Sequence, residues 1–127
     1  MQVTQRLLDK MRELRLREFD RRVRGHLLAV FPEHAAEFKS PGFDGRVAEA
    51  MSRAEPQGIV SERGIVKFIE TLYRLRFAPP QPELSSWAQR VLASPDLDPV
   101  AKIDHVHLTV LEATTSNRPS STLDHRP

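Results

Sequence analysis

Two short segments carry the side chains that could bind a metal ion or transfer a proton. In the first, Glu33-His34-Ala35-Ala36-Glu37, His34 and Glu37 lie three residues apart and would face the same side of a helix. Helical carboxylate metal sites need further ligands from other helices in a Glu-x-x-His order, and no other predicted helix offers that spacing. We therefore expect a solvated turn here, with no metal ion and no other cofactor.

The second segment is Asp104-His105-Val106-His107. Side chains two residues apart on a helix point about 200° from each other, so the two histidines cannot hold one ion. We expect His107 to lie on the apolar face as a buried, hydrogen-bonded histidine and His105 to lie on the surface. Neither is expected to be catalytic.

The residue types also give little indication of cysteine chemistry or of a phosphate-binding loop. The chain has no cysteine, which excludes disulfides, thiolate metal sites and cysteine nucleophiles. The glycines form no phosphate-binding loop, and Gly58 is placed to supply a positive φ between two helices. We predict no catalytic residue and a protein that is not an enzyme.

Helical periodicity dominates the 127 residues and predicts an all-α fold, a compact bundle of about five helices. We expect one helical domain over residues 1–113 and a disordered tail over residues 114–127, which has few apolar residues. Ser40-Pro41, Ser61 and Asp98-Pro99 are start signals, since a capping side chain precedes the first helical turn. The predicted helices are 4–31, with Thr4 as N-cap, 41–54, 61–77, 85–93 and 98–113, with a short turn of helix after Pro32.

Apolar residues at helical spacing predict the core. The expected core stripes are Leu8, Leu16, Phe19, Val23, Leu27 and Val30 in the first helix, Ile65, Phe68, Ile69, Leu72 and Leu75 in a central third helix, and Val100, Ile103, Val106, Val110 and Leu111 in the last. The opposite face of the third helix is expected to be polar, with Lys67, Glu70, Thr71 and Arg74.

The first helix has a second apolar stripe that one straight helix cannot bury in the same core. Leu7, Met11 and Leu14 lie nearly opposite the stripe that continues through Phe19 and Val23. We interpret the second stripe as a protein-binding surface whose rim is formed by Arg6, Lys10 and Arg17. The alternative is a contact with a later helix of the same chain.

Net charge is +2 but uneven, because residues 1–24 hold eight Lys and Arg against four Asp and Glu. Five basic residues of the first helix project within about 60° of one another, namely Arg6, Lys10, Arg17, Arg21 and Arg24. Such a face could follow a phosphate backbone, so a nucleic-acid-binding regulator is an alternative function. Intermixed acidic residues make nucleic acid the less favoured partner.

The sequence also bears on location. No apolar run approaches the roughly 20 residues that span a bilayer, and the first residues contain no apolar signal-peptide region. We expect a cytoplasmic protein without membrane insertion.

A set of short patterns resembles one family. One group begins at the third helix and comprises Gly58 to Gly64 (GIVSERG), Val66 to Ile69, Leu72, Trp87-Ala88, Leu92 to Leu97 and Ala101 to Ile103. The other group belongs to the first helix and the residues after it, and comprises Phe19, His26-Leu27 and Phe31 to His34. Over about residues 15–111 the chain resembles small helical proteins encoded beside spike, PAAR-type and effector components of bacterial type VI secretion systems.

The resemblance implies a binding role and transfers no catalytic residue. The expected function is an accessory adaptor or co-chaperone, and the expected partner is a secretion effector, PAAR or spike protein. A toxin-neutralising immunity protein is a further alternative.

Overall fold

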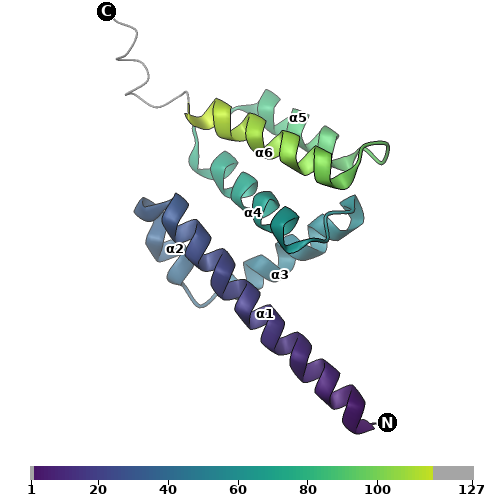
Figure 1. The fold of residues 1–127 in the computed structure, drawn as a ribbon. Coiled ribbons are helices and arrows are strands. Elements are labelled where there is room, and N and C mark those ends of the chain that lie inside the picture. The colour runs from purple at the N-terminus through teal and green to yellow at the C-terminus, as the bar shows by residue number, and fades with distance from the viewer. Residues whose placement is uncertain (1, 116–127) are drawn as a thin grey trace, which may run out of the picture. The chain divides into compact units, whose positions relative to one another are not determined.

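The computed structural model describes residues 2–115, without the side chains of residues 2–4 and 8. All regular structure in that range is helical, which confirms the all-α prediction (Figure 1). The helices are α1 (Gln2–Val30), α2 (Ala35–Lys39), α3 (Phe43–Ala54), α4 (Glu62–Phe77), α5 (Pro82–Ala93) and α6 (Pro99–Thr115), with 3-10 turns η1 (Pro32–His34) and η2 (Glu55–Gln57). The short turn expected after Pro32 is η1 with α2.

The chain divides into two compact units, residues 1–48 and residues from 49 onward. Helix α3 begins in the first unit and ends in the second.

The first unit is built on the C-terminal part of α1. Helix α1 contacts η1 and α2, which turn away from its axis because Pro32 cannot continue the helix. The rings of Phe31 and Phe38 lie 6.1 Å apart, and those of Phe38 and Phe43 lie 5.8 Å apart, edge to face. The buried apolar side chains of α1 are Phe19, Val23 and Leu27.

The start of α3 differs from the prediction. The sequence predicts that Ser40 caps a helix beginning at Pro41, but α3 begins at Phe43. The Ser40 hydroxyl instead donates a hydrogen bond to the Glu37 carbonyl at 3.0 Å. It therefore serves the end of α2, and Pro41 and Gly42 form a turn.

The second unit begins its helical core at α4. The Ser61 hydroxyl accepts from the Gly64 amide at 3.0 Å, which confirms Ser61 as N-cap. Gly58 has φ 81°, as predicted, and a Cβ atom there would lie 2.7 Å from Pro99 Cγ. Both the left-handed backbone and the close approach require glycine.

Helix α6 packs on α4 and on α5 within this unit (Figure 1). The Asp98 carboxylate accepts from the Ala101 amide at 3.0 Å, so the predicted cap of the last helix is present. Helix α5 begins at Pro82 rather than at residue 85, because proline needs no amide partner in the first turn.

Several side chains that the sequence predicts in the core are not fully buried. Leu16 is 48% exposed and Val100 61% exposed, although the sequence predicts both in the core. Leu72 and Leu75 are only half-buried.

The prediction for the polar face of α4 is wrong in the opposite sense. Glu70 and Thr71 are predicted to lie on the polar face, opposite the core side of the helix, but both are buried. Helix α6 packs against α4, and its His107 lies 3.0 Å from the Glu70 carboxylate, so this face is covered.

Both ends of the predicted domain fall near the limits of the described residues. Helix α1 already includes Gln2, two residues before the Thr4 predicted as N-cap. Thr114 and Thr115 belong to α6, and the rest of the predicted tail, residues 116–127, lies outside the described residues. None of the helices in residues 2–115 has the length and apolar character needed to cross a membrane.

Candidate protein-interaction surface

The N-terminal part of α1 is exposed on all sides. Every described side chain of residues 5–18, here called the exposed half of α1, is exposed. Leu7 is 60% exposed, Met11 43% and Leu14 48%. The second apolar stripe predicted from the sequence is therefore open to a binding partner.

The residues of the exposed half explain why it is helical without burial. Residues 5–18 are Leu, Arg, Met, Lys, Gln and Glu except for one aspartate, and most of these are strong helix formers. Asp9 accepts from Gln5 Nε2 at 3.1 Å and lies 3.8 Å from Arg12. The helix also continues into residues that are packed, so the costly first turn need not form alone.

The predicted rim residues lie beside this stripe. Arg6, Lys10 and Arg17 are all exposed, and at 100° per residue they lie on one side of the line through Leu7 and Leu14. Their positive charges can orient an approaching acidic surface.

Residues 19–30, here called the anchored half of α1, behave differently. The Arg24 guanidinium donates from Nη2 to Asp44 Oδ1 at 2.7 Å and from Nη1 to the Phe38 carbonyl. It also lies 5.0 Å from the centre of the Phe43 ring. Arg24 is thus engaged within the first unit, and it is one of the five basic residues on which the nucleic-acid hypothesis depends.

One acidic residue of the anchored half is electrostatically unfavourable. Burial raises the pKa of Asp20, the nearby Asp44 carboxylate raises it further, and Arg24 lowers it. The charged form of Asp20 is therefore less stable than that of a free carboxyl group.

Of the side chains after Pro32 that were considered as metal ligands, Glu37 is engaged by an arginine. Glu37 pairs with Arg46 at 2.8 Å, while Glu33 is exposed and His34 is half-buried. In residues 2–115 no group of three or more His, Asp or Glu side chains is arranged to hold a metal ion.

The two histidines of α6 separate as the spacing predicted. His105 is exposed and its ring lies 5.3 Å from that of Trp87, edge to face. His107 is half-buried rather than fully buried, and its Nε2 lies 3.0 Å from Glu70 Oε2.

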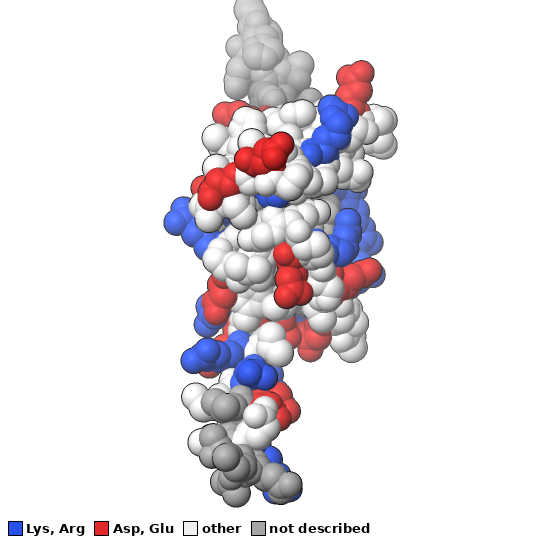
Figure 2. Space-filling model, turned by 90° about the vertical axis from the view of Figure 1, so that its right-hand side faces the viewer, with Lys and Arg blue, Asp and Glu red and all other residues white. Residues whose placement is uncertain are grey.

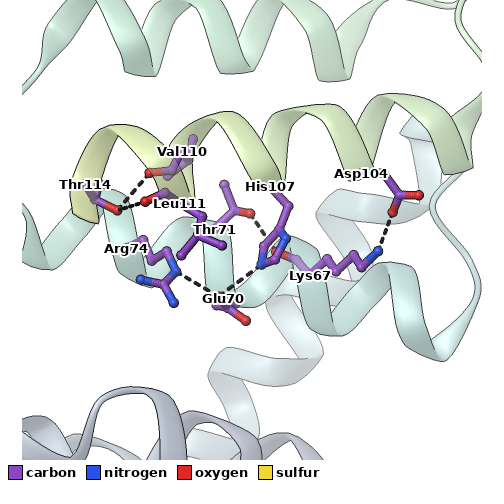
Figure 3. A network of polar contacts seen from close by, with 9 residues as sticks. All are labelled: Lys67, Glu70, Thr71, Arg74, Asp104, His107, Val110, Leu111 and Thr114. Atoms are coloured by element: carbon purple, nitrogen blue, oxygen red, sulfur yellow. Dashed lines mark hydrogen bonds and ion pairs between the residues drawn. The ribbon is translucent and has the colours of Figure 1, made fainter. Parts of the chain in front are cut away.

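Figure 3 shows the polar cluster that His107 joins between α4 and α6. Glu70 Oε2 also accepts from Arg74 Nε at 2.7 Å, and both partners are largely shielded from water. The Thr71 hydroxyl donates to the Lys67 carbonyl at 2.7 Å, one turn earlier in the same helix. The Thr71 hydroxyl is thus engaged within its own helix, while the contact of His107 with Glu70 joins α6 to α4.

A second polar contact joins the same helices nearer the start of α6. Lys67 Nζ donates to Asp104 Oδ1, and this bond lowers the pKa of Asp104 (Figure 3). The pair is partly exposed and lies at the edge of the α4–α6 contact.

A small pocket of about 140 Å³ lies where α4 and α6 begin, lined mainly by apolar side chains that include Ile59, Val60 and Val100. Val60 and Val100 are exposed there. The polar residues that line it are Ser61, Arg63 and Asp104.

Sequence reasoning placed the exposed stripe but not the Glu70 cluster or the pocket. The stripe could be found because three apolar residues lie off the main periodic face. Glu70 and Arg74 give no such signal, since an i,i+4 pair of opposite charge is typical of a solvated helix surface.

Comparison with known proteins identifies no relative: no family model, no curated protein and no solved structure matches the chain. The resemblance to type VI secretion accessory proteins stays a prediction.

Proposed function

We propose that this protein is a non-catalytic protein-interaction module that binds its partner through the exposed half of α1. One observation carries the proposal: a helical segment of residues 5–18 presents Leu7, Met11 and Leu14 to solvent. Removing such side chains from water on contact with another protein is favourable, by about 25 cal/mol per Å² of apolar area.

The resemblance gives the finer form of the proposal. The partner is a type VI secretion effector, PAAR or spike protein, and the module acts in the cytoplasm as an adaptor or co-chaperone. Covering an apolar surface of that partner before delivery would be its physical role.

Nucleic acid is a weaker candidate on the charges present. Arg24 is engaged by Asp44, and acidic and basic side chains are intermixed on the face shown in Figure 2. Phosphate recognition needs basic groups without such neutralisation.

The test is affinity capture of the full chain co-expressed with the products of its neighbouring genes, and we expect an effector, PAAR or spike protein to be recovered. Leu7→Asp with Met11→Asp is expected to leave the helical circular dichroism spectrum unchanged and to abolish capture. A charge that must lose its water in a contact costs several kcal/mol, whereas on a solvated helix face it costs little.

Leu16→Asp is the matched control, because Leu16 and Leu14 are both leucines with 48% exposure on the same helical segment. At 100° per residue the two side chains point about 200° apart. Capture by Leu16→Asp should equal wild type. Normal capture by the double Asp variant would contradict the proposal, and loss of DNA binding in Arg17→Glu with Arg21→Glu would favour the regulator instead.

A further inference from the structure

The spacing of the exposed apolar residues defines a particular kind of contact. Leu7, Met11 and Leu14 are separated by four and then three residues, which is the d-a-d spacing of a coiled-coil heptad. All three are exposed on a continuous helix. The stripe is therefore narrow and suited to one partner helix rather than to a broad, flat surface.

The charges beside this stripe have one sign. In the same register the flanking e and g positions include Lys10, Arg15 and Arg17. All three are exposed, and none of them forms an ion pair within the described part of the chain.

Two of the three acids of the exposed half lie at outer heptad positions, and the third, Glu18, falls at position a beyond Leu14. Asp9 falls at position f, where it contacts Gln5 and Arg12. Glu13 falls at position c, also away from the stripe. The basic flanks are thus not neutralised by acids at the flanking positions themselves.

This charge pattern bears on whether a second copy could be the partner. In a parallel pair of copies, Lys10 of one chain would face Arg15 of the other. In an antiparallel pair the charged flanks that meet would again be basic. Like charges opposed across a coiled coil are destabilising, so self-pairing along this stripe is disfavoured.

We propose that the exposed half of α1 pairs with a short amphipathic helix of another protein, whose apolar stripe is flanked by Glu or Asp. This inference rests on the proposed function and specifies the partner's chemistry. The apolar contacts hold the two helices together, while the opposed charges select the partner and its register.

The interface would be small and sensitive to salt. Leu7, Met11 and Leu14 span little more than one heptad. The area that they can bury is well below that of a standard stable interface, so the complex is transient unless a second surface joins. Added salt weakens it because the flanking charges are exposed.

The test uses two designed peptides and the full chain. Both peptides are amphipathic helices with Leu at a and d, and they differ only in having Glu or Lys at e and g. Fluorescence anisotropy measures their binding. The Glu peptide should bind wild type at least about tenfold more tightly than the Lys peptide, and salt should weaken it.

Charge reversal provides the decisive variant. Lys10→Glu, Arg15→Glu and Arg17→Glu together should invert the preference in favour of the Lys peptide. Leu14→Asp should abolish binding of the Glu peptide, and Leu16→Asp should leave it unchanged. In analytical ultracentrifugation, wild type and Leu14→Asp should show the same state of association, because the wild type does not pair through this stripe.

Three results would overturn the inference: equal binding of the two peptides, a preference that survives charge reversal, or dimers that depend on Leu14. Failure of the proposed function is distinct, because there the double Asp variant still captures its partner protein. If the two peptides bind equally but capture still depends on Leu7 and Met11, the proposed interaction surface is supported and the proposal of an acidic partner helix is wrong.

Discussion

The two halves of α1 are both helical but have opposite surroundings. In the anchored half, Phe19, Val23 and Leu27 are buried. In the exposed half, Leu14 and Leu16 are as apolar, yet each is 48% exposed. Helix formation and burial are therefore separate outcomes, because the first depends on local propensity and continuity and the second on the elements that pack alongside.

The difference arises from the segments that come after α1 in the first unit. Pro32 ends the helix, and η1 and α2 then contact α1 while the Phe31, Phe38 and Phe43 rings pack in series. Arg24 fixes this arrangement through the Phe38 carbonyl and Asp44.

Matched alanine substitutions in the two halves should give the largest contrast. Leu27→Ala removes a fully buried side chain and should lower the free energy of unfolding by about 2–5 kcal/mol. Leu14→Ala should change it by less than about 0.5 kcal/mol. Chemical denaturation with a common m-value would measure both, and a large cost for Leu14→Ala would show that the exposed half is packed.

Arginine substitutions should give a smaller contrast. Arg24→Ala removes two hydrogen bonds and a ring contact, with an expected loss of about 1–2 kcal/mol. Arg17→Ala should be close to neutral in thermal unfolding, since Arg17 lies on the exposed half. Equal effects would mean that the Arg24 contacts do not stabilise the first unit.

The smallest contrast concerns two aspartates. The raised pKa of Asp20 means that folding disfavours its charge, so its contribution to stability is present in acid and lost as pH rises through its folded pKa. Asp20→Asn should therefore raise the melting temperature slightly at neutral pH and not in acid. Asp9→Asn, in the exposed half, should raise the melting temperature at neutral pH by less, and equal gains would contradict this explanation.

Local signals predicted the elements well. Ser61, Asp98-Pro99 and Gly58 stand where caps and a left-handed turn are expected, because these features depend on neighbouring residues. Ser40-Pro41 misled because the Ser40 hydroxyl has a competing acceptor at the end of α2.

Which side chains are buried could be predicted less well than the positions of the helices. The sequence marks Leu16 and Val100 as apolar at the right spacing, but it does not show that neither is covered. Glu70 shows the converse, since only the approach of α6 makes this carboxylate a buried partner of His107 and Arg74.

The position of the candidate surface could be predicted from the sequence, but the identity of its partner could not. Leu7, Met11 and Leu14 depart from the main apolar face, and that departure needs no tertiary information to be seen. The partner's identity depends on a second sequence, of which this chain supplies only the complementary charge pattern.

Peptide-resolved hydrogen–deuterium exchange of the full chain can show whether the exposed half of α1 is the binding surface. Without a partner, amides of residues 5–18 should exchange orders of magnitude faster than those of residues 19–30, because an unsupported helical segment opens readily. Adding the captured partner protein should slow exchange in residues 5–18 and leave residues 19–30 little changed. Equal protection of the two halves in the free protein, or no change in residues 5–18 on binding, would contradict the role proposed for the exposed half.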